Sequence, residues 1–360
     1  MAATPGDRRL VVIVLRGGMD GLDVVRPVGD PAFAAVRAGL LDGPSGEPLD
    51  NFFALHPALS KLMPLWRQGD LAFAHAVSTP YRDKRSHFEG QDMLEAGLPQ
   101  VDGITKPDSG WMNRLLTMLP GATARTGFSV GREGTLILKG DAPHTTWYPS
   151  TALSVSGQAE ALFELVYQED PLFQAMSKQA FQLMEATDPD ALEPGTPGHI
   201  RVADYLAEQL LQDTRVATFS ITGWDSHRRQ AAALRRPLGE LADTIMHLQG
   251  RLGSVWDNTV VLAMTEFGRS VRENGTSGTD HGTGGAMLMA GGAVKGGRVY
   301  GRWPGLDEAD LYARRDLMPT ADVRGYAALG LGAMFGISQS DLESRLFPGL
   351  DMAGTQPFLA

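Results

Sequence analysis

The sequence predicts an α/β protein in which a mainly parallel sheet is sandwiched between helices. Three apolar runs of strand length, 10–15, 216–222 and 259–264, each end in a loop that carries polar side chains. Segments with helical spacing alternate with these runs, as is typical of parallel sheets covered by helices on both faces. At 360 residues with 43% hydrophobic content, the chain can bury one large core, so we expect a single domain over residues 1–360.

The first part of the chain is expected to alternate strands and helices. A buried strand over Leu10–Leu15 comes first, and a helix over about 57–66 ends at Gly69. A strand over Leu71–Val77 then leads through a polar loop to a helix over about 86–96.

The middle and last parts follow the same alternation around one irregular segment. Residues 99–155, rich in Gly, Pro and Thr, are expected to be loops and short strands inserted over the sheet. The Pro-containing stretch 188–197 is the expected linker between two helices. In chain order, the further expected elements are helices over 159–184 and 201–212, a strand over 216–222, a helical region over 227–252, a strand over 259–264, and a final amphipathic helix over 321–335.

Composition restricts the classes of ligand and partner. The formal net charge of −10 argues against broad binding to nucleic acid or anionic membranes, although a local basic pocket could hold an anionic substrate. The chain has no cysteine, so any metal would be bound by oxygen and nitrogen ligands. No apolar run is long enough to span a bilayer.

The start of the chain resembles a twin-arginine export signal only in part. Arg8 and Arg9 precede the apolar run Leu10–Leu15, but that run is only six residues long before Arg16. This is too short for the apolar region of a signal peptide. We therefore interpret it as the first core strand.

Residues that bind divalent metals follow three of the expected strands. In open α/β sheets, functional groups gather just past the carboxyl ends of the strands, and Asp, Glu and His are ligands that zinc accepts. The alternative is that each carboxylate caps the next helix or lines a turn. We predict one shared metal centre, and its candidate ligands are Asp20, Asp225, His227, Glu266, Asp280 and His281.

The loop before the expected helix at 86–96 carries candidate catalytic residues. Ser86 and Glu89 form a capping-box pattern, which is the structural alternative to a catalytic role. A helix N-terminus also suits a phosphate or sulfate group, and Arg82 and Arg85 add positive charge nearby. With a metal to lower the pKa of its hydroxyl, Ser86 could act as a nucleophile, and we count the neighbouring His87 among the catalytic candidates.

An ordered set of motifs along nearly the whole chain resembles the family filed as domain of unknown function 1501. These motifs are Gly17–Leu22, Ser86–Phe88, Gly223–His227, Thr265–Arg269, Asp280–Gly282 and Ala290–Gly292. The family is placed near the alkaline phosphatase and sulfatase superfamily, so the resemblance implies an alkaline phosphatase-like α/β sandwich around a two-metal site. It also implies export through the twin-arginine route and a periplasmic location, although no signal peptide is recognised in this chain.

The similarity to that superfamily is incomplete at one metal position. Where the sulfatase motif ends in Asp-His-Gly, this chain has Glu266, Phe267 and Gly268. A phenylalanine cannot bind a metal, so the second metal position has lost a ligand. The position that is kept would use Asp225, His227 and His281 with Asp280 added, and the weakened one would use Asp20, Glu266 and Ser86.

We therefore expect a metal-dependent hydrolase of small anionic phosphate esters. Ser86 would attack, the metal would polarise an ester oxygen, and Arg82 or Arg85 would hold the anion. Sulfate esters are less favoured, because the chain has no cysteine for formylglycine formation. The metal is expected to be zinc, manganese, magnesium or calcium. Two alternatives stay open, a non-catalytic metal-binding or assembly protein and an isomerase like the phosphomutases. The histidines outside these motifs, His56, His75, His144 and His247, are expected to be packing or surface residues.

Overall fold

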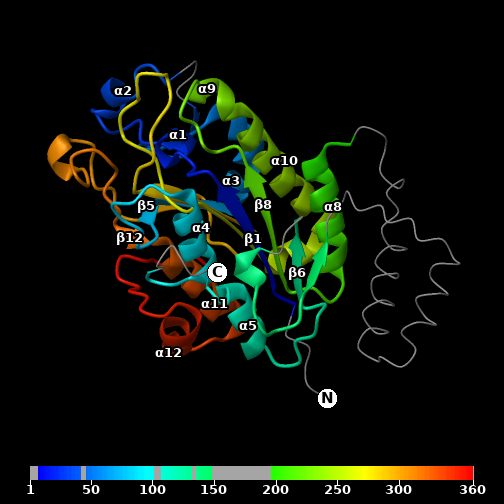
Figure 1. Cartoon of the computed structure of the whole chain (residues 1–360). Coiled ribbons are helices and arrows are strands. Elements are labelled where there is room, and N and C mark those ends of the chain that lie inside the picture. Colours follow the sequence, from blue (N-terminus) through cyan, green and yellow to red (C-terminus); the bar gives the residue numbers. More distant parts are fainter. Residues whose placement is uncertain (1–6, 42–45, 101–106, 132–134, 148–195, 360) are drawn as a thin grey trace, which may run out of the picture.

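The computed structural model describes residues 7–41, 46–100, 107–131, 135–147 and 196–359. These residues form a central mixed sheet with helices on both faces (Figure 1). The strand order is β11-β5-β10-β9-β1-β8-β6-β7, and β12 also pairs with β5. The expected α/β class with a mainly parallel sheet is therefore confirmed.

The strands of this sheet are mostly parallel. In chain order they are β1 Arg9–Arg16, β5 Leu71–Ser78, β6 Gly127–Val130, β7 Thr145–Trp147, β8 Val216–Thr222, β9 Thr259–Met264, β10 Gly285–Ala290, β11 Arg298–Tyr300 and β12 Ala321–Asp322. Among the described strands of this sheet, only β10 runs antiparallel to its neighbours, β5 and β9. A smaller sheet joins β2 Val25–Arg26, β4 Ala54–Leu55 and β3 Glu47–Pro48.

Helices cover the sheet on its two faces. The α-helices are α1 Gly21–Val24, α2 Phe33–Val36, α3 Met63–Gln68, α4 His87–Ala96, α5 Trp111–Met118, α8 Gly198–Leu211, α9 Gln230–Ala233, α10 Arg235–Leu252, α11 Val323–Phe335 and α12 Gln339–Asp341. The 3₁₀-helices are η1 Pro57–Leu62, η2 Leu136–Leu138, η3 Gly253–Asn258 and η4 Glu308–Asp310, and the π-helix is η5 Leu342–Leu346. In the described part of the chain, no helix is both long enough and apolar enough to cross a membrane.

Strand β1 lies at the centre of the core, which explains its uninterrupted apolar sequence. Val11 and Ile13 belong to a core cluster with residues of α3, α8 and α10. Leu10 and Val12 point to the opposite face and share a second cluster with residues of α5 and α11. Because side chains of a strand alternate between the two faces, a strand covered by helices on both must be apolar throughout.

The boundaries of helix α4 agree closely with the sequence. Ser86 is the N-cap, and its hydroxyl accepts a hydrogen bond from the Glu89 amide. Gly97 adopts a left-handed conformation with φ of 66° and ends the helix. That conformation is accessible to glycine at little cost. The α4 N-terminus therefore has a fixed position, with His87 as its first residue.

Three sequence expectations need correction. Residues 99–155 do not simply lie over the sheet, because β6 and β7 extend it in parallel beyond β8, and α5 packs against one face. The helix expected over 321–335 is preceded by β12 and followed by α12 and η5, so it is not the last element. It is also buried along most of its length rather than amphipathic. The helix expected over 159–184 and most of the linker expected over 188–197 lie outside the described residues.

Candidate metal centre

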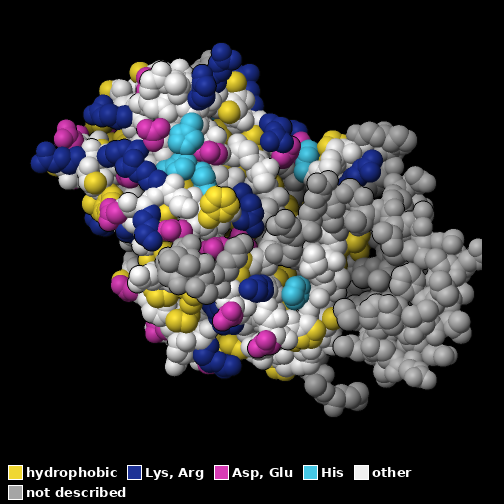
Figure 2. Space-filling model, in the orientation of Figure 1, with side chains coloured by type: hydrophobic (Ala, Val, Ile, Leu, Met, Phe, Trp, Pro, Cys, Tyr) yellow, Lys and Arg dark blue, Asp and Glu magenta, His cyan; other side chains and the backbone are white. Residues whose placement is uncertain are grey.

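The carboxyl ends of three neighbouring strands bring the predicted ligands together. Strands β9, β1 and β8 are adjacent and parallel, and their register places Arg16 beside Thr222 and Val14 beside Met264. The loops that follow these strands therefore meet at one edge of the sheet, where functional groups gather in such folds. Histidine side chains form a patch on the molecular surface there, among acidic and basic side chains (Figure 2).

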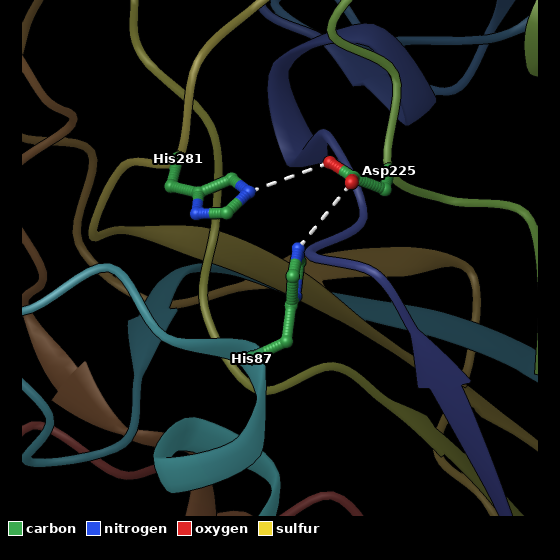
Figure 3. A group of neighbouring side chains, drawn as sticks. All are labelled: His87, Asp225 and His281. Atoms are coloured by element: carbon green, nitrogen blue, oxygen red, sulfur yellow. Dashed lines mark hydrogen bonds and ion pairs between the residues drawn. The ribbon is translucent and has the colours of Figure 1, made fainter.

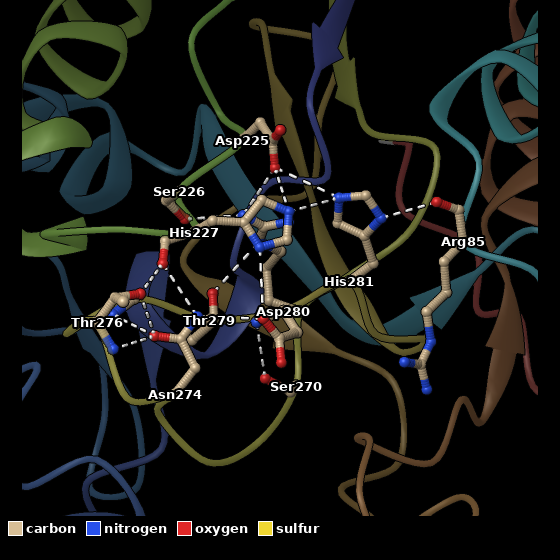
Figure 4. A network of polar contacts seen from close by, with 12 residues as sticks. Arg85, Asp225, Ser226, His227, Ser270, Asn274, Thr276, Thr279, Asp280 and His281 are labelled. Atoms are coloured by element: carbon tan, nitrogen blue, oxygen red, sulfur yellow. Dashed lines mark hydrogen bonds and ion pairs between the residues drawn. The ribbon is translucent and has the colours of Figure 1, made fainter.

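Three histidine rings surround the carboxylate of Asp225. The Nε2 atom of His227 lies 3.0 Å from Asp225 Oδ1, and that of His281 lies 3.4 Å from the same oxygen. The Nε2 atom of His87 lies 3.6 Å from Asp225 Oδ2 (Figure 3). His227 and His281 also approach each other, with 2.9 Å between their Nε2 atoms (Figure 4). Four potential ligands thus converge from α4, the loop after β8 and the loop after β9.

The other ring nitrogen of each histidine faces an oxygen acceptor. His87 Nδ1 lies 2.8 Å from Glu266 Oε1, and His281 Nδ1 lies 2.9 Å from the carbonyl oxygen of Arg85. His227 Nδ1 lies 3.4 Å from Asp280 Oδ1. A neutral histidine that donates its Nδ1 proton to such an acceptor has a lone pair on Nε2, which is the arrangement of metal-binding histidines.

The residues present fit a divalent metal ion. One ligand atom each from His87, Asp225 and His281 lies within 4.8 Å of the others. His87 Nε2 is shielded from solvent and has no hydrogen-bond partner. A buried nitrogen without a partner is costly, and a bound cation would satisfy it. A donor set of imidazoles and one carboxylate is of the kind that zinc accepts.

The charges around Asp225 keep its carboxyl ionised. Burial favours the neutral form, but the Arg269 guanidinium and the neighbouring histidines outweigh burial and hold the pKa of Asp225 below its usual value. Arg269 Nη2 donates to Asp225 Oδ1 at 3.0 Å, and its side chain is fully buried. Asp225 itself remains 46% exposed, so a ligand from solvent can reach it.

Glu266 acts on the centre through His87 rather than by lying within the cluster. Its Oε1 atom faces His87 Nδ1 and accepts from the Gly17 amide at 2.9 Å and from Gln91 Nε2 at 3.1 Å. Burial alone would raise the pKa of Glu266, but these hydrogen bonds, first that of His87, lower it. The same contact raises the pKa of His87. Glu266 therefore orients the ring of His87.

Asp20 is held in a buried ion pair. Both its carboxylate oxygens face the Arg37 guanidinium, and Gln230 Nε2 donates to it at 2.6 Å. It also caps α1 by accepting from the Leu22 amide at 3.1 Å. Burial opposes ionisation, but Arg37 outweighs burial and lowers the pKa of Asp20. The structure thus brings Asp225, His227 and His281 together. Asp20 pairs with Arg37 instead, and hydrogen bonds through Gln230, Ser226 and Arg269 link it to Asp225.

Asp280 lies at the outer side of the centre. Its Oδ1 atom faces His227 and accepts from Asn274 Nδ2 at 3.1 Å, and Arg315 Nη2 lies 3.8 Å from its other oxygen. The Asn274 hydrogen bond is the main cause of its lowered pKa. Asp280 is thus placed to orient His227.

The catalytic candidates of the 78–97 loop have different surroundings. The Ser86 hydroxyl lies at the N-terminus of α4 and accepts from the Glu89 amide over 3.5 Å, a long hydrogen bond. The Arg82 guanidinium donates to the carbonyl groups of Thr79 and Tyr81. The carbonyl of Arg85 faces His281, while its guanidinium points away from the histidines (Figure 4). Neither arginine side chain is directed at Asp225.

Comparison with known proteins identifies the family. The sequence profile described as "Protein of unknown function (DUF1501)" matches residues 74–345. The chain belongs to this family. The matched range contains His87, Asp225 and His281, so the cluster of three potential ligands lies within the part of the chain that matches the family. No curated protein matches the chain.

Several solved structures are similar to this DUF1501 chain. A protein in the alkaline phosphatase superfamily from Vibrio parahaemolyticus has 13% identity and a TM-score of 0.38, covering 81% of this chain and 62% of that chain. Ps i-CgsB in complex with k-i-k-neocarrahexaose has 10% identity and a TM-score of 0.42, covering 96% and 75%. A mutant of TAB5 alkaline phosphatase with Mg bound has 12% identity and a TM-score of 0.35, covering 81% and 92%. The chain thus spans less than two thirds of the first of these proteins.

Phe267 of this DUF1501 chain has a packing role beside the centre. It is 2% exposed, and its ring centroid lies 5.1 Å from those of both His87 and His281. Tyr81 stacks on it at 5.9 Å. An added Cβ at Gly18 would lie 2.7 Å from this ring, so the glycine is needed for close approach. Phe267 therefore fixes two histidine rings instead of binding a metal.

Four residues that pair with the predicted carboxylates were not predicted from the sequence. The signal for Arg269 was its position in the sequence, because it lies in the motif Thr265–Arg269, three residues after Glu266. The others, Arg37, Gln91 and Gln230, carry no local signal, because each reaches its carboxylate across a long stretch of chain.

Proposed function

We propose that this protein is a metal-dependent hydrolase of phosphate esters. The supporting observation is that three Nε2 atoms gather around Asp225 while each Nδ1 faces an oxygen acceptor. His87, Asp225 and His281 would hold the ion, with His227 beside them as a further ligand. The donor set favours zinc over magnesium or calcium, which prefer oxygen ligands. When bound, the ion supplies Lewis acidity toward an ester oxygen.

Helix α4 supplies the protein groups that would act on the ester. His87 is its first residue, so the first turn, with its free amide groups and the positive end of the helix dipole, lies beside the centre. In this proposal these amides hold a phosphoryl oxygen, a role for which neither Arg82 nor Arg85 has its guanidinium in place. Ser86 is the proposed nucleophile, because its hydroxyl is at the same helix end and has only one long hydrogen bond there.

A single ion per chain is part of the proposal. Asp20 is neutralised by Arg37, and Phe267 occupies the position of the missing histidine, so the groups expected for a second ion have other partners. The two guanidinium groups of Arg37 and Arg269 supply permanent positive charge near the carboxylates instead. The loss of the second metal position also fits a non-catalytic metal-binding protein. The experiment must therefore distinguish a hydrolase from a protein that only binds metal.

The test combines metal analysis with an ester panel. Purified protein is stripped with a chelator, reloaded with zinc, manganese, magnesium or calcium, and assayed with an aryl phosphate, a phosphodiester and an aryl sulfate. We expect one tightly held ion per chain and turnover of the aryl phosphate. His281→Ala should lose both, whereas His247→Ala, which removes a histidine paired with Asp204 on the helices, should lose neither. Wild-type protein without any bound ion would contradict the proposal, and bound metal without turnover would favour the non-catalytic function.

A periplasmic location is also proposed, on the family resemblance alone. Fractionation of cells that express the complete gene product from its native start would place the protein in the periplasm or in the cytoplasm. Recovery only from the cytoplasm would contradict the location and leave the site chemistry unaffected.

A further inference from the structure

A cavity of about 880 Å³ lies beside the metal centre. It is bounded by α4, the beginning of α8 and the ends of β6 and β8, elements that are labelled in Figure 1. Its volume is in the range of clefts that hold small organic ligands. Apolar side chains make up much of its wall, among them Phe88, Val130, Leu136, Val202, Phe219 and Ile221.

Two walls of the cavity continue directly into the metal centre. On α4, the cavity is lined by Phe88, Gln91, Asp92 and Glu95, which have the spacing of one helix face. The residue before this face is His87, whose ring points to the metal centre instead. On β8 the lining ends at Thr222, three residues before Asp225. A molecule whose reacting group lies at Asp225 can therefore extend along α4 into the cavity.

The part of the cavity's polar edge formed by Arg16 is already internally paired. Arg16 donates from Nε to Ser220 at 2.9 Å and from Nη1 to Gln91 at 2.7 Å, and its Nη2 lies 2.7 Å from Glu95. Since this guanidinium has partners on three sides, it is not arranged to hold a second anionic group. The remaining wall near the centre is best suited to an apolar group.

Phe88 is exposed at this cavity in an unusual way. Its side chain is 83% exposed, and the described residues contain only two other exposed large hydrophobic side chains, Val28 and Leu211. Phe88 lines the cavity and directly follows His87. An aromatic ring left in solvent next to a reactive centre gains free energy when an apolar ligand covers it.

We propose that the cavity binds the organic group of the ester and that Phe88 packs against it. The substrate class is then an ester of a bulky aryl or alkyl alcohol, with the phosphoryl group at Asp225 and the apolar group along α4. This inference rests on the proposed function for its reaction, but the binding of the apolar group can be measured without turnover.

The kinetic test compares two phosphate monoesters, 1-naphthyl phosphate and methyl phosphate. Phe88→Ala should raise KM for the naphthyl ester about tenfold, in line with the loss of one apolar contact, and leave KM for the methyl ester and kcat for both nearly unchanged. Leu211→Ala removes another exposed large hydrophobic side chain, which lies outside the cavity, and should change nothing. Equal effects of Phe88→Ala on both esters, or none on either, would overturn the inference.

A binding test separates this inference from the proposed reaction. Metal-free wild-type protein should quench the fluorescence of 1-naphthol on binding it, and Val202→Trp, which fills the cavity, should weaken this binding at least tenfold while melting at a similar temperature. Naphthol binding that is lost in Val202→Trp supports the cavity even if no ester is hydrolysed. The cavity proposal would be overturned if the protein hydrolyses esters but does not bind naphthol, and if Phe88→Ala and Val202→Trp keep the wild-type KM. The proposed hydrolase function would be unaffected by that result.

Discussion

Asp20 and Asp225 follow adjacent parallel strands, yet their surroundings are opposite. Asp20 is 1% exposed and is neutralised by Arg37, with Gln230 as a further donor. Asp225 is 46% exposed and faces three histidine rings, with Arg269 behind it. Both carboxyl groups have lowered pKa values, so ionisation alone does not distinguish them. The difference lies in how far each carboxylate is covered. Arg37 faces both oxygens of Asp20, whereas Asp225 pairs with Arg269 and keeps a side chain that is 46% exposed.

This comparison indicates that a carboxylate at a strand end can accept a metal ion only if the fold leaves it a vacant side. Arg37 reaches Asp20 from α2's C-terminal end and also donates to the carbonyls of Val271 and Ser270, so it is itself held in place. A metal ion would have to displace this buried cation. At Asp225, the three Nε2 atoms and the solvent-exposed side of the carboxylate leave room for an ion.

The largest expected effect is that of Asp20→Asn. This change leaves the Arg37 guanidinium buried without its counter-charge, which costs about 3 to 5 kcal/mol of unfolding free energy. The metal content of the folded protein should stay at the wild-type level. Urea unfolding in chelator measures the first quantity, and elemental analysis of the folded fraction measures the second.

Asp225→Asn is the matched variant on the other side of the comparison. It should lose the metal, with a smaller change of stability in chelator because its side chain is half exposed. If Asp20→Asn loses the metal while remaining folded, Asp20 is a ligand after all, and the contrast between the two carboxylates fails.

The second prediction concerns His75, a histidine that is buried as fully as Asp20. It packs between Phe53 and Trp303, Nε2 faces the carbonyl of Val25 and Nδ1 accepts from the Ala76 amide. Burial lowers the pKa of His75 to about 4. Between about pH 6.5 and pH 4 the unfolded chain therefore binds a proton that the folded chain does not, so stability falls as the pH falls.

The magnitude follows from the size of this pKa shift. The part of the unfolding free energy that depends on His75 is fully present above about pH 6.5. About 2 kcal/mol of it is lost between about pH 7 and pH 5. Urea unfolding of wild type and His75→Gln at both pH values, in chelator, measures the difference between the two pH dependences. Identical pH dependences would show that His75 does not titrate in this way.

The strands and helix α4 could be predicted because their signals are local. The runs at 10–15, 216–222 and 259–264 are apolar on both faces, and α4 has a capping residue at one end and a glycine at the other. Strand β10 was missed, since Gly285–Ala290 begins with glycine and has no β-branched residue, unlike the equally long β9. The addition of β6 and β7 to the main sheet is a matter of long-range pairing, which no local pattern encodes.

The site was predictable in its residue types but not in its division of roles. Asp225, His227 and His281 stand in glycine-rich loops after strands, and the structure does bring them together. His87 was expected among catalytic residues, yet its Nε2 faces the same carboxylate, because α4 is packed with its N-terminus toward β8 and β9. Asp20 was expected as a ligand, and its partner Arg37 could not be foreseen, since their pairing depends on how the chain folds back after α1.

The third prediction tests the outer support of the centre. Glu266→Gln keeps the shape of the side chain but removes the charge that His87 Nδ1 faces. Losses of such outer partners weaken metal binding about 10-fold to 100-fold. A competition titration with a fluorescent chelator should show this decrease, with the far-UV circular dichroism unchanged. Gln91→Leu is the control, since it removes the side-chain amide that donates to Glu266 Oε1 but leaves the contact with His87 in place, and it should weaken metal binding less. Wild-type metal affinity in Glu266→Gln would contradict the orienting role.

The smallest effect on stability, and the one that decides the chemistry, is expected for Ser86. As the N-cap of α4, its hydroxyl contributes about 1 kcal/mol, so Ser86→Ala should lower the unfolding free energy by that amount, and Ser86→Gly by less, because glycine is a tolerated cap. If Ser86 is the nucleophile, both variants should lose turnover of an aryl phosphate while still binding metal, since His87, Asp225 and His281 are unchanged. Stability and activity would then be separated within one side chain. Turnover that is proportional to the folded fraction in both variants would show that Ser86 is only a cap and that water attacks the ester. The N-terminus of α4 would then hold His87 and the phosphoryl oxygens without supplying the nucleophile.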